Sequence, residues 1–185
     1  MPNWAFGVVQ VTGQKKNVRE FIEKNFLSIY DIRPNKFKDI KFFARSFISD
    51  TYRNIFNQFN EELEQVNTED ECTYSFTVQF AWSALTCLID GYPQDYKDEC
   101  IDLPTACKQY KVDVAITTEE SGMCFEEHII CNRNGEITTN DCYDMSTYKC
   151  LNCGSEQCFP SHEEEYYCYE CDNKGFKNST YRASF

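Results

Sequence analysis

Four cysteines near the C-terminal end constrain the fold of this chain more than any other feature. They are Cys150, Cys153, Cys168 and Cys171, with the spacing C-x2-C-x14-C-x2-C. Two residues between the cysteines of a pair allow both thiolates to face one tetrahedral metal ion, and two such pairs on successive hairpins complete a four-thiolate site. Gly154, which follows the first pair, permits the tight turn that zinc ribbons need. The spacing therefore predicts a structural zinc ion in a small zinc ribbon over residues 147–185.

The same cysteines have two other interpretations, a disulfide pair and a redox-active dithiol. No thioredoxin-like unit precedes them, which argues against the dithiol. Cys158 and His162 lie between the two pairs, but four ligands already complete a tetrahedron, so we expect both outside the ligand set. A closed site leaves no position for a reactive water, and the tail has few apolar residues. We therefore expect the zinc to fold the tail rather than to catalyse a reaction.

The cellular compartment bears on the disulfide interpretation. The chain has 185 residues, of which 42% are hydrophobic and 16% aromatic, so it can bury a core without disulfides. It has no apolar run of the roughly 18 residues that a membrane span needs, and its first residues do not form the pattern of a signal peptide. These features predict a cytoplasmic protein without a membrane segment, in which the 12 cysteines are thiols or metal ligands.

Seven further cysteines have no such spacing. They are Cys72, Cys87, Cys100, Cys107, Cys124, Cys131 and Cys142. A buried free cysteine behaves as a small hydrophobic residue, and we interpret them in that way. The equal offsets of Cys100 from Cys107 and of Cys124 from Cys131 would alternatively suit a second metal site, and His128 with Cys124 or Cys131 would suit a nucleophilic pair. Because glycine-rich phosphate loops, H-E-x-x-H and a nucleophile elbow are absent, we predict no catalytic site.

Charge is distributed unevenly along the chain, whose net charge is -12. Residues 61–127 carry three Lys and Arg against sixteen Asp and Glu, whereas residues 1–60 carry ten against five. The expected binding surface is the acidic run Glu61, Glu62, Glu64, Glu69, Asp70 and Glu71. Such a surface repels phosphate backbones and attracts basic proteins. The simpler interpretation is that these charges only keep the protein soluble.

One segment of the basic first third interleaves charge with aromatic residues. In "KFKDIKFFARSF", Lys36, Lys38, Lys41 and Arg45 alternate with phenylalanines, as on surfaces that bind single-stranded nucleic acid. A half-buried strand with a charged outer face explains the same pattern, and we favour that interpretation over residues 36–50. Lys174, Lys177 and Arg182 of the tail would add to a nucleic-acid surface.

Hydrophobic periodicity predicts the elements of the first half. A β-branched strand is expected over residues 6–12, and the following helix has an apolar stripe of Val18, Phe21, Ile22 and Phe26. A second helix is expected to begin after Ser49 or Asp50. Its apolar stripe comprises Tyr52, Ile55, Phe56, Phe59, Leu63 and Val66. Helices with one apolar stripe pack that stripe on a sheet or on another helix.

The next segment, "YSFTVQFAW", alternates strictly between bulky and small or polar residues. It predicts a strand that lies centrally in a sheet and buries Phe76, Phe80 and Trp82. A helix near residues 102–110 and strands over 111–118, 124–132 and 137–143 are expected to follow, with a tight turn at Asn132–Glu136. This order predicts an α+β sandwich over residues 1–142, with one antiparallel or mixed sheet and helices on one face.

The order of several short motifs resembles the YubB/Api92 family. The motifs are "PNW" at Pro2–Trp4, "VTG" at Val11–Gly13, "AWS" at Ala81–Ser83 and "YP" at Tyr92 and Pro93. The family is a ferredoxin-like domain encoded on phages, plasmids and other mobile elements, so the resemblance implies a ferredoxin-like fold for residues 1–142. It implies no catalytic residues. The chain departs from the family pattern at residues 5–7, which read "AFG", and at Ala84, where the family has proline.

Charge, motifs and resemblance together predict a non-enzymatic binding protein of a mobile genetic element. Its expected partner is a host protein, which it would engage or inhibit through the acidic surface, with the zinc as a structural cofactor. The alternative is a single-stranded nucleic-acid-binding or transcription-regulatory zinc-ribbon protein, with Lys36, Lys38, Lys41 and Arg45 as contacts. The sequence does not indicate an oligomeric state.

Overall fold

Helices and strands alternate in the first half of the chain, and strands predominate in the second. The computed structural model describes residues 3–28, 46–90, 101–160, 167–172 and 174–178. In chain order the elements are β1 (Trp4–Gln14), α1 (Lys15–Asn25), β2 (Leu27–Ser28), β3 (Ser46–Ile48), α2 (Tyr52–Glu62), β4 (Glu71–Ala81), the π-helical turn η1 (Thr86–Asp90), α3 (Leu103–Tyr110), β5 (Asp113–Glu120), β6 (Phe125–Cys131), β7 (Ile137–Cys150), β8 (Glu156–Pro160) and β9 (Phe176–Asn178).

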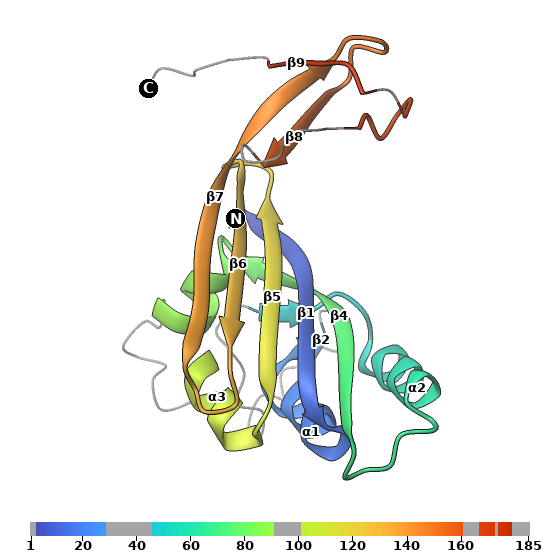
Figure 1. Cartoon of the computed structure of the whole chain (residues 1–185), viewed down its shortest axis with the longest axis vertical. Coiled ribbons are helices and arrows are strands. Elements are labelled where there is room, and N and C mark those ends of the chain that lie inside the picture. Colours follow the sequence, from blue (N-terminus) through green and yellow to red (C-terminus); the bar gives the residue numbers. More distant parts are fainter. Residues whose placement is uncertain (1–2, 29–45, 91–100, 161–166, 173, 179–185) are drawn as a thin grey trace.

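The strands form one curled main sheet and a smaller lobe. The main sheet has the order β2-β3-β4-β1-β5-β6-β7, and its neighbours are antiparallel except for the short parallel pair β2 and β3. β7 continues beyond the main sheet and pairs there with β8 and β9, so these three strands build a lobe that projects from one end (Figure 1). The protein is thus an α+β fold; the ferredoxin-like arrangement in particular stays a prediction.

The core lies between one face of the main sheet and the three helices. α1 contributes Val18, Phe21 and Ile22 to it, and α2 contributes Ile55 and Phe59. All three helices lie in the half of the molecule away from the lobe (Figure 1). None of the helices in the described ranges is long and apolar enough to cross a membrane.

Alternation along β4 places its bulky side chains in this core, as the sequence predicts. Tyr74, Phe76, Val78 and Phe80 are all buried. The Phe59 and Tyr74 rings lie 5.0 Å apart, and the Tyr74 hydroxyl donates a hydrogen bond of 3.0 Å to the Ile55 carbonyl oxygen. Burial raises the pKa of Tyr74 to about 12, so the hydroxyl keeps its proton and remains a donor. β4 lies in the interior of the sheet, between β3 and β1.

Trp82 is an exception, because the prediction that it is buried was wrong. Its side chain is 44% exposed, and its backbone adopts the left-handed conformation with φ of 69°. β4 ends at Ala81, and the Trp82 N–H donates a hydrogen bond of 2.8 Å to the Asn3 carbonyl oxygen. The backbone turns at Trp82 itself, where the two-residue alternation of β4 ends, so the Trp82 ring leaves the core face.

Two boundaries also differ from the sequence prediction. α2 is capped by Thr51, whose hydroxyl accepts a hydrogen bond of 3.2 Å from the Asn54 N–H, and not by Ser49 or Asp50. The helix ends at Glu62, so Leu63 and Val66 pack beyond its C-terminus.

Of the strand expected over residues 36–50, only residues 46–48 are described as strand, and residues 36–45 lie outside the described part.

Candidate functional site

The lobe brings the four cysteines of the C-x2-C pairs together. Their sulfur atoms all lie within 4.8 Å of one another. Cys150 Sγ is 3.7 Å from Cys171 Sγ, and Cys153 Sγ is 3.5 Å from Cys168 Sγ. Around a tetrahedral ion with metal–sulfur bonds of about 2.3 Å, the sulfurs would lie about 3.8 Å apart. The group is therefore close enough to bind one metal ion.

The two cysteine pairs have the same backbone geometry. In the first, the Gly154 N–H donates a hydrogen bond of 2.9 Å to the Cys150 carbonyl oxygen; in the second, the Asp172 N–H donates one of 2.8 Å to Cys168. Gly154 and Asp172 each follow the second cysteine of their pair and have φ of 77° and 54°. Both pairs are thus the same left-handed turn, which explains why a glycine stands at one of these positions.

A hydroxyl group lies between the two pairs and favours the thiolate form. Ser155 Oγ is 3.2 Å from Cys153 Sγ and 3.3 Å from Cys168 Sγ. Hydrogen bonding to Ser155 is the main cause of the lowered pKa of Cys153. It is also the main cause that lowers the pKa of Cys168 to about 6. Backbone N–H groups add to both effects. Metal ions bind the thiolate, so this site is prepared to bind one near neutral pH.

Few apolar side chains support the lobe. Met145, Cys150, Phe159 and Cys168 are its buried hydrophobic residues in the described ranges. The Phe159 ring lies 6.0 Å from Tyr148 and 5.7 Å from Tyr169, but Tyr169 is 78% exposed. The strand pairs β7–β8 and β7–β9 extend over only a few residues each. A metal ion at the four thiols would therefore be the strongest link within the lobe.

Other cysteines lie apart from this cluster. Cys158 does not join the four-thiol group, as expected, and His162 lies outside the described residues. Cys72, Cys87, Cys107 and Cys131 are buried, in agreement with their interpretation as small hydrophobic residues, whereas Cys142 is exposed and Cys124 is half-buried. Cys100 lies outside the described residues. Among the described residues no second group of three or more metal-ligating side chains is found, so the equal offsets build no further site there.

His128 does not pair with either candidate cysteine. It lies on the helix-free face of β6, while Cys131, three residues on, is fully buried on the other face. The His128 ring instead contacts the Glu126 carboxylate through Nε2, and its Nδ1 lies 3.5 Å from Thr117 Oγ1. Cys124 lies beside Cys158. The nucleophilic pair is therefore not formed.

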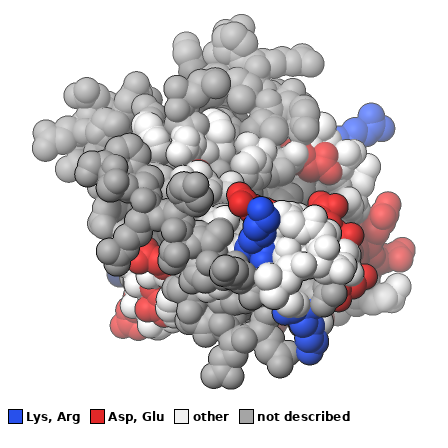
Figure 2. All heavy atoms as spheres, turned by 90° about the horizontal axis from the view of Figure 1, so that it is seen from above, with Lys and Arg blue, Asp and Glu red and all other residues white. Residues whose placement is uncertain are grey.

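The acidic run that the sequence singles out is exposed but partly neutralised. All of Glu61, Glu62, Glu64, Glu69, Asp70 and Glu71 are exposed. Glu69 forms an ion pair of 2.6 Å with Lys16, and Glu71 forms one of 2.8 Å with Arg133. Glu61, Glu62 and Glu64 form no ion pair with another described residue. On the end of the molecule that Figure 2 shows, acidic and basic side chains are interspersed among the described residues.

A second acidic surface lies on the face of the main sheet opposite the core, which none of the described helices covers, and sequence reasoning did not place one there. Strand register aligns Phe6, Glu119 and Glu126 in one row across β1, β5 and β6. The adjacent row aligns Val8, Thr117, His128 and Asp141, and the next aligns Gln10, Ala115, Ile130 and Thr139. The three rows continue onto β4 with Gln79, Thr77 and Ser75, and the first row continues onto β7 with Tyr143. We call the three rows with these four residues the open face.

The open face combines exposed apolar side chains with carboxylates. Phe6 is 51% exposed, Val8 43% and Ile130 41%. A shallow hollow of about 580 Å³ lies over Phe6 and Val8, with Glu119 and Glu126 at its border. The three rows contain no lysine or arginine. The alternation of "FGVVQVT" in β1 is the signal that could have found this face, since it places Phe6 and Val8 opposite the buried valines.

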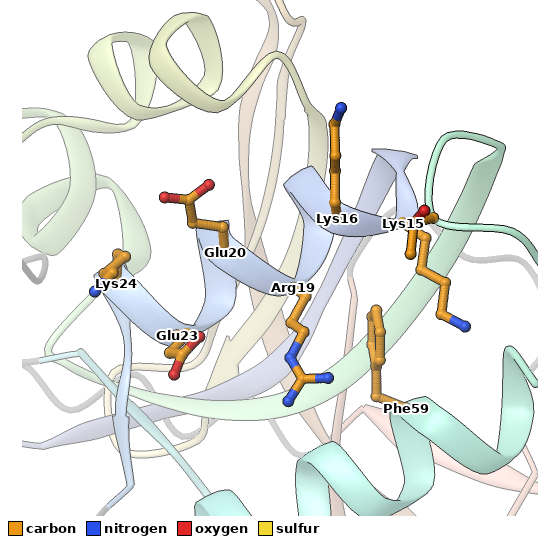
Figure 3. A pocket seen from close by; sticks show the side chains of 8 residues that line it. Lys15, Lys16, Arg19, Glu20, Glu23, Lys24 and Phe59 are labelled. Atoms are coloured by element: carbon orange, nitrogen blue, oxygen red, sulfur yellow. The ribbon is translucent and has the colours of Figure 1, made fainter.

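Basic side chains gather elsewhere, along α1. Figure 3 shows a hollow lined by Lys15, Lys16, Arg19, Glu20, Glu23 and Lys24 of α1 together with Phe59 of α2. Its volume is about 360 Å³. Lys15 Nζ donates to the carbonyl oxygens of residues 63 and 66, Lys16 pairs with Glu69, and Arg19 lies 5.2 Å from the Phe56 ring centroid. Three of these cations therefore already have partners within the protein, which makes this hollow a poor phosphate site.

Most of the residues expected to contact nucleic acid lie outside the described part of the chain, so the structure does not test this prediction. Lys36, Lys38, Lys41, Arg45 and Arg182 lie outside the described residues. Lys174 Nζ lies 4.7 Å from the centroid of the Tyr167 ring. Comparison of the chain with family models, curated proteins and solved structures finds no match.

Proposed function

We propose that the protein is a non-enzymatic, zinc-stabilised binding protein that engages a basic partner protein through its acidic surface. The observation that carries the proposal is the open face, where Glu119 and Glu126 line a hollow with exposed Phe6 and Val8, Asp141 lies farther along the Val8 row, and the rows contain no lysine or arginine. A carboxylate beside an exposed aromatic ring suits arginine, which pairs with the first and stacks on the second. The same arrangement disfavours phosphate.

Zinc is the metal that best suits the four thiols. Four thiolates in a tetrahedron are typical of structural zinc sites. Cys150, Cys153, Cys168 and Cys171 would fill all four positions, so the ion would fold the lobe and would have no free position for a substrate. Ser155 would stabilise two of the thiolates, and the turns at Gly154 and Asp172 would hold the pairs in place.

The mobile-element origin and the host partner are part of the proposal. They rest on the resemblance of residues 1–142 to the YubB/Api92 family, as does the ferredoxin-like description of the main sheet. The unpaired part of the acidic run, Glu61 and Glu62 at the end of α2 and Glu64 just beyond it, is the alternative contact. Cytoplasmic location belongs to the same proposal.

Capture of a partner by the zinc-loaded full chain tests the proposal. The chain is immobilised and exposed to host lysate at moderate salt, and bound proteins are identified. Two triple variants remove equal charge. One, on the open face, carries Glu119→Gln, Glu126→Gln and Asp141→Asn; the other, the α2 triple, carries Glu61→Gln, Glu62→Gln and Glu64→Gln at and just beyond the C-terminal end of α2. We expect the open-face triple to lose the partner and the α2 triple to retain it.

The other outcomes are equally informative. Loss of capture only in the α2 triple moves the contact to α2, and unchanged capture in both triples refutes an acidic contact. Binding of a fluorescent single-stranded oligonucleotide at low ionic strength, without capture of a protein, favours the nucleic-acid alternative instead.

A further inference from the structure

Two cysteines outside the metal cluster are in contact across the junction between the main sheet and the lobe. Cys124 Sγ lies 3.5 Å from Cys158 Sγ. Cys124 precedes β6 in the turn that joins β5 to β6, whereas Cys158 lies in β8 of the lobe. Both side chains are half-buried, so reagents in solution have access to the pair. Sequence spacing gives no hint of this contact, because 34 residues separate the two positions.

β7 holds both cysteines against one short stretch of its backbone. The Met145 N–H donates a hydrogen bond of 2.6 Å to the Cys124 carbonyl oxygen. Cys158 lies opposite Thr147 in the β7–β8 pair, and Thr147 Oγ1 lies 3.4 Å from Cys158 Sγ. Met145 and Thr147 are two positions apart on the same strand and therefore point to the same side of it. The two thiols are thus held together by strand register.

This pair differs from the other close cysteines of the protein. Cys107 and Cys131 are also near each other, with Cys107 Sγ 3.9 Å from the Cys131 carbonyl oxygen, but both are fully buried in the core. The four cysteines of the metal cluster would be protected by coordination. Among the described residues no third ligating group joins Cys124 and Cys158, so the pair does not form a second metal site there. The Cys124–Cys158 pair therefore combines contact between the two sulfur atoms with access for reagents in solution.

We propose that Cys124 and Cys158 form a reversible disulfide when the protein meets a peroxide or a low-molecular-weight disulfide. With hydrogen peroxide, one thiolate attacks a peroxide oxygen, the O–O bond breaks, and a sulfenic acid and hydroxide form. The second thiolate then attacks the sulfenic sulfur and displaces hydroxide. Two thiols lose two electrons and two protons, and the peroxide becomes two water molecules. With a low-molecular-weight disulfide, one protein thiolate attacks a sulfur of the reagent and displaces one reagent thiolate. The second protein thiolate then attacks the protein sulfur of this mixed disulfide and displaces the other, so the reagent is reduced to two thiols.

Bond formation must bring the two sulfur atoms from 3.5 Å to an S–S distance of roughly 2.05 Å. The bond would close a loop that contains β6, β7 and the first cysteine pair of the metal cluster. It would therefore attach the lobe to the β5–β6 turn as well as to β7.

Titration of the zinc-loaded full chain with hydrogen peroxide, and separately with oxidised glutathione, tests the proposal. Remaining thiols are alkylated, cross-linked peptides are mapped by mass spectrometry under non-reducing conditions, and zinc is measured in the same samples. We expect the peptide that links Cys124 to Cys158 to appear at least tenfold faster than alkylation is lost at exposed Cys142. Zinc is retained, and dithiothreitol restores both thiols.

Matched single substitutions separate this proposal from its alternatives. Cys124→Ser and Cys158→Ser abolish the linked peptide, whereas Cys142→Ser leaves it unchanged, and far-ultraviolet circular dichroism verifies that each variant is folded. Oxidation of the four cluster cysteines with loss of zinc, while Cys124 and Cys158 remain open to alkylation, overturns the proposal. So does a lower zinc content in Cys124→Ser, because the pair would then be part of a metal site. The test does not depend on a partner protein.

Discussion

The main sheet and the lobe share one strand, β7, but they are held together in different ways. The main sheet packs on three helices around a contiguous core to which every helix contributes. The lobe has four buried hydrophobic residues in the described ranges, and two of them are cysteines of the metal cluster. Buried apolar area can stabilise the first region. The lobe has little of it among the residues whose burial the structure describes, so we expect metal binding by the thiols to supply most of its folding energy.

The two regions can share one strand because each pairs with a different part of it. Along β7, residues 137–144 pair with β6, and residues 145–150 pair with β8 and β9. The first part is an edge of the main sheet and needs no metal. The second part has partners only when the lobe is folded. We therefore expect the two regions to lose structure separately.

Removal of the metal should have the largest effect and should be confined to the lobe. Zinc binding to thiolate-rich sites contributes roughly 10 kcal/mol or more near neutral pH, so Cys168→Ser or a strong chelator should unfold residues 145–178. Amide hydrogen exchange should then rise throughout the lobe while β1, β4 and β5 stay protected. Cys142→Ser is the matched control and should leave both zinc content and exchange unchanged.

A result that would contradict this prediction is easily recognised. If the lobe keeps its exchange protection without metal, its few apolar contacts are enough to keep it folded. The main sheet and the lobe are then not stabilised in different ways. If the main sheet also unfolds, the two regions form one cooperative unit.

A cavity in the core should produce the opposite pattern. Phe80 is fully buried in β4, and Phe80→Ala should lower the free energy of unfolding of the main sheet by about 3–5 kcal/mol. The content of the proposed zinc ion should not change, because its ligands do not belong to the core of the main sheet. Phe6→Ala, at an exposed position on the neighbouring strand, should change stability by less than about 0.5 kcal/mol. Chemical denaturation with elemental analysis of each sample measures both effects.

The Ser155 hydroxyl offers a finer test of the thiolate site. Its hydrogen bonds are the main cause of the lowered pKa of Cys168, so Ser155→Ala should raise that pKa from about 6 toward the ordinary thiol range. Zinc affinity at neutral pH should fall by about tenfold and should recover as the pH is raised. A competition titration with a chromophoric chelator over pH 6 to 9 measures the shift. An affinity loss that is equal at every pH would show that Ser155 acts only through packing.

The two equivalent turn positions allow a matched pair of substitutions. Gly154 and Asp172 both have positive φ. A Cβ at Gly154 would make only an ordinary van der Waals contact, 3.8 Å from Lys149 Cε, so only backbone strain opposes Gly154→Ala. That variant should lose about 1–2 kcal/mol of lobe stability, seen as weaker zinc binding. Asp172→Gly should relieve strain at the second turn and should bind zinc at least as tightly. A stronger loss in Asp172→Gly than in Gly154→Ala would disprove the equivalence.

Features set by local patterns could be predicted from the sequence. The alternation of β4 gave Phe76 and Phe80 their buried positions, and the two cysteine pairs identified the four clustered thiols. Local patterns were less decisive at element ends. Three potential capping residues follow one another at Ser49, Asp50 and Thr51, and Trp82 leaves the sheet because the backbone turns at that residue.

Features set by strand register could not be predicted in this way. The open face depends on which residues of β1, β5, β6 and β7 stand opposite one another. The contact of Cys124 with Cys158 likewise depends on how β6 and β8 align on β7. The alternation of β1 indicates that Phe6 and Val8 share an exposed face, but it does not say which residues of β5 and β6 lie beside them. The spacing of the cysteines gives no sign of the contact between Cys124 and Cys158. Pairwise information between distant positions would have been needed for both.

Arg133 should show the smallest effect, because it joins elements of the main sheet only at the surface. Its guanidinium contacts the Asp113 carboxylate at 2.5 Å and that of Glu71 at 2.8 Å, and so connects the β6–β7 turn to β5 and β4. The side chain is 40% exposed, so solvent screening limits Arg133→Gln to a loss of less than about 1 kcal/mol.

The hydrogen bonds from Arg133 lower the pKa of Asp113, so this stabilisation is present above the ordinary aspartate pKa and is lost as the pH falls through the lowered value. Thermal unfolding should therefore separate variant from wild type by a few degrees at neutral pH and by progressively less in acid, while zinc content stays the same. A difference that persists undiminished in acid would assign the effect to packing of the arginine stem instead of its charge.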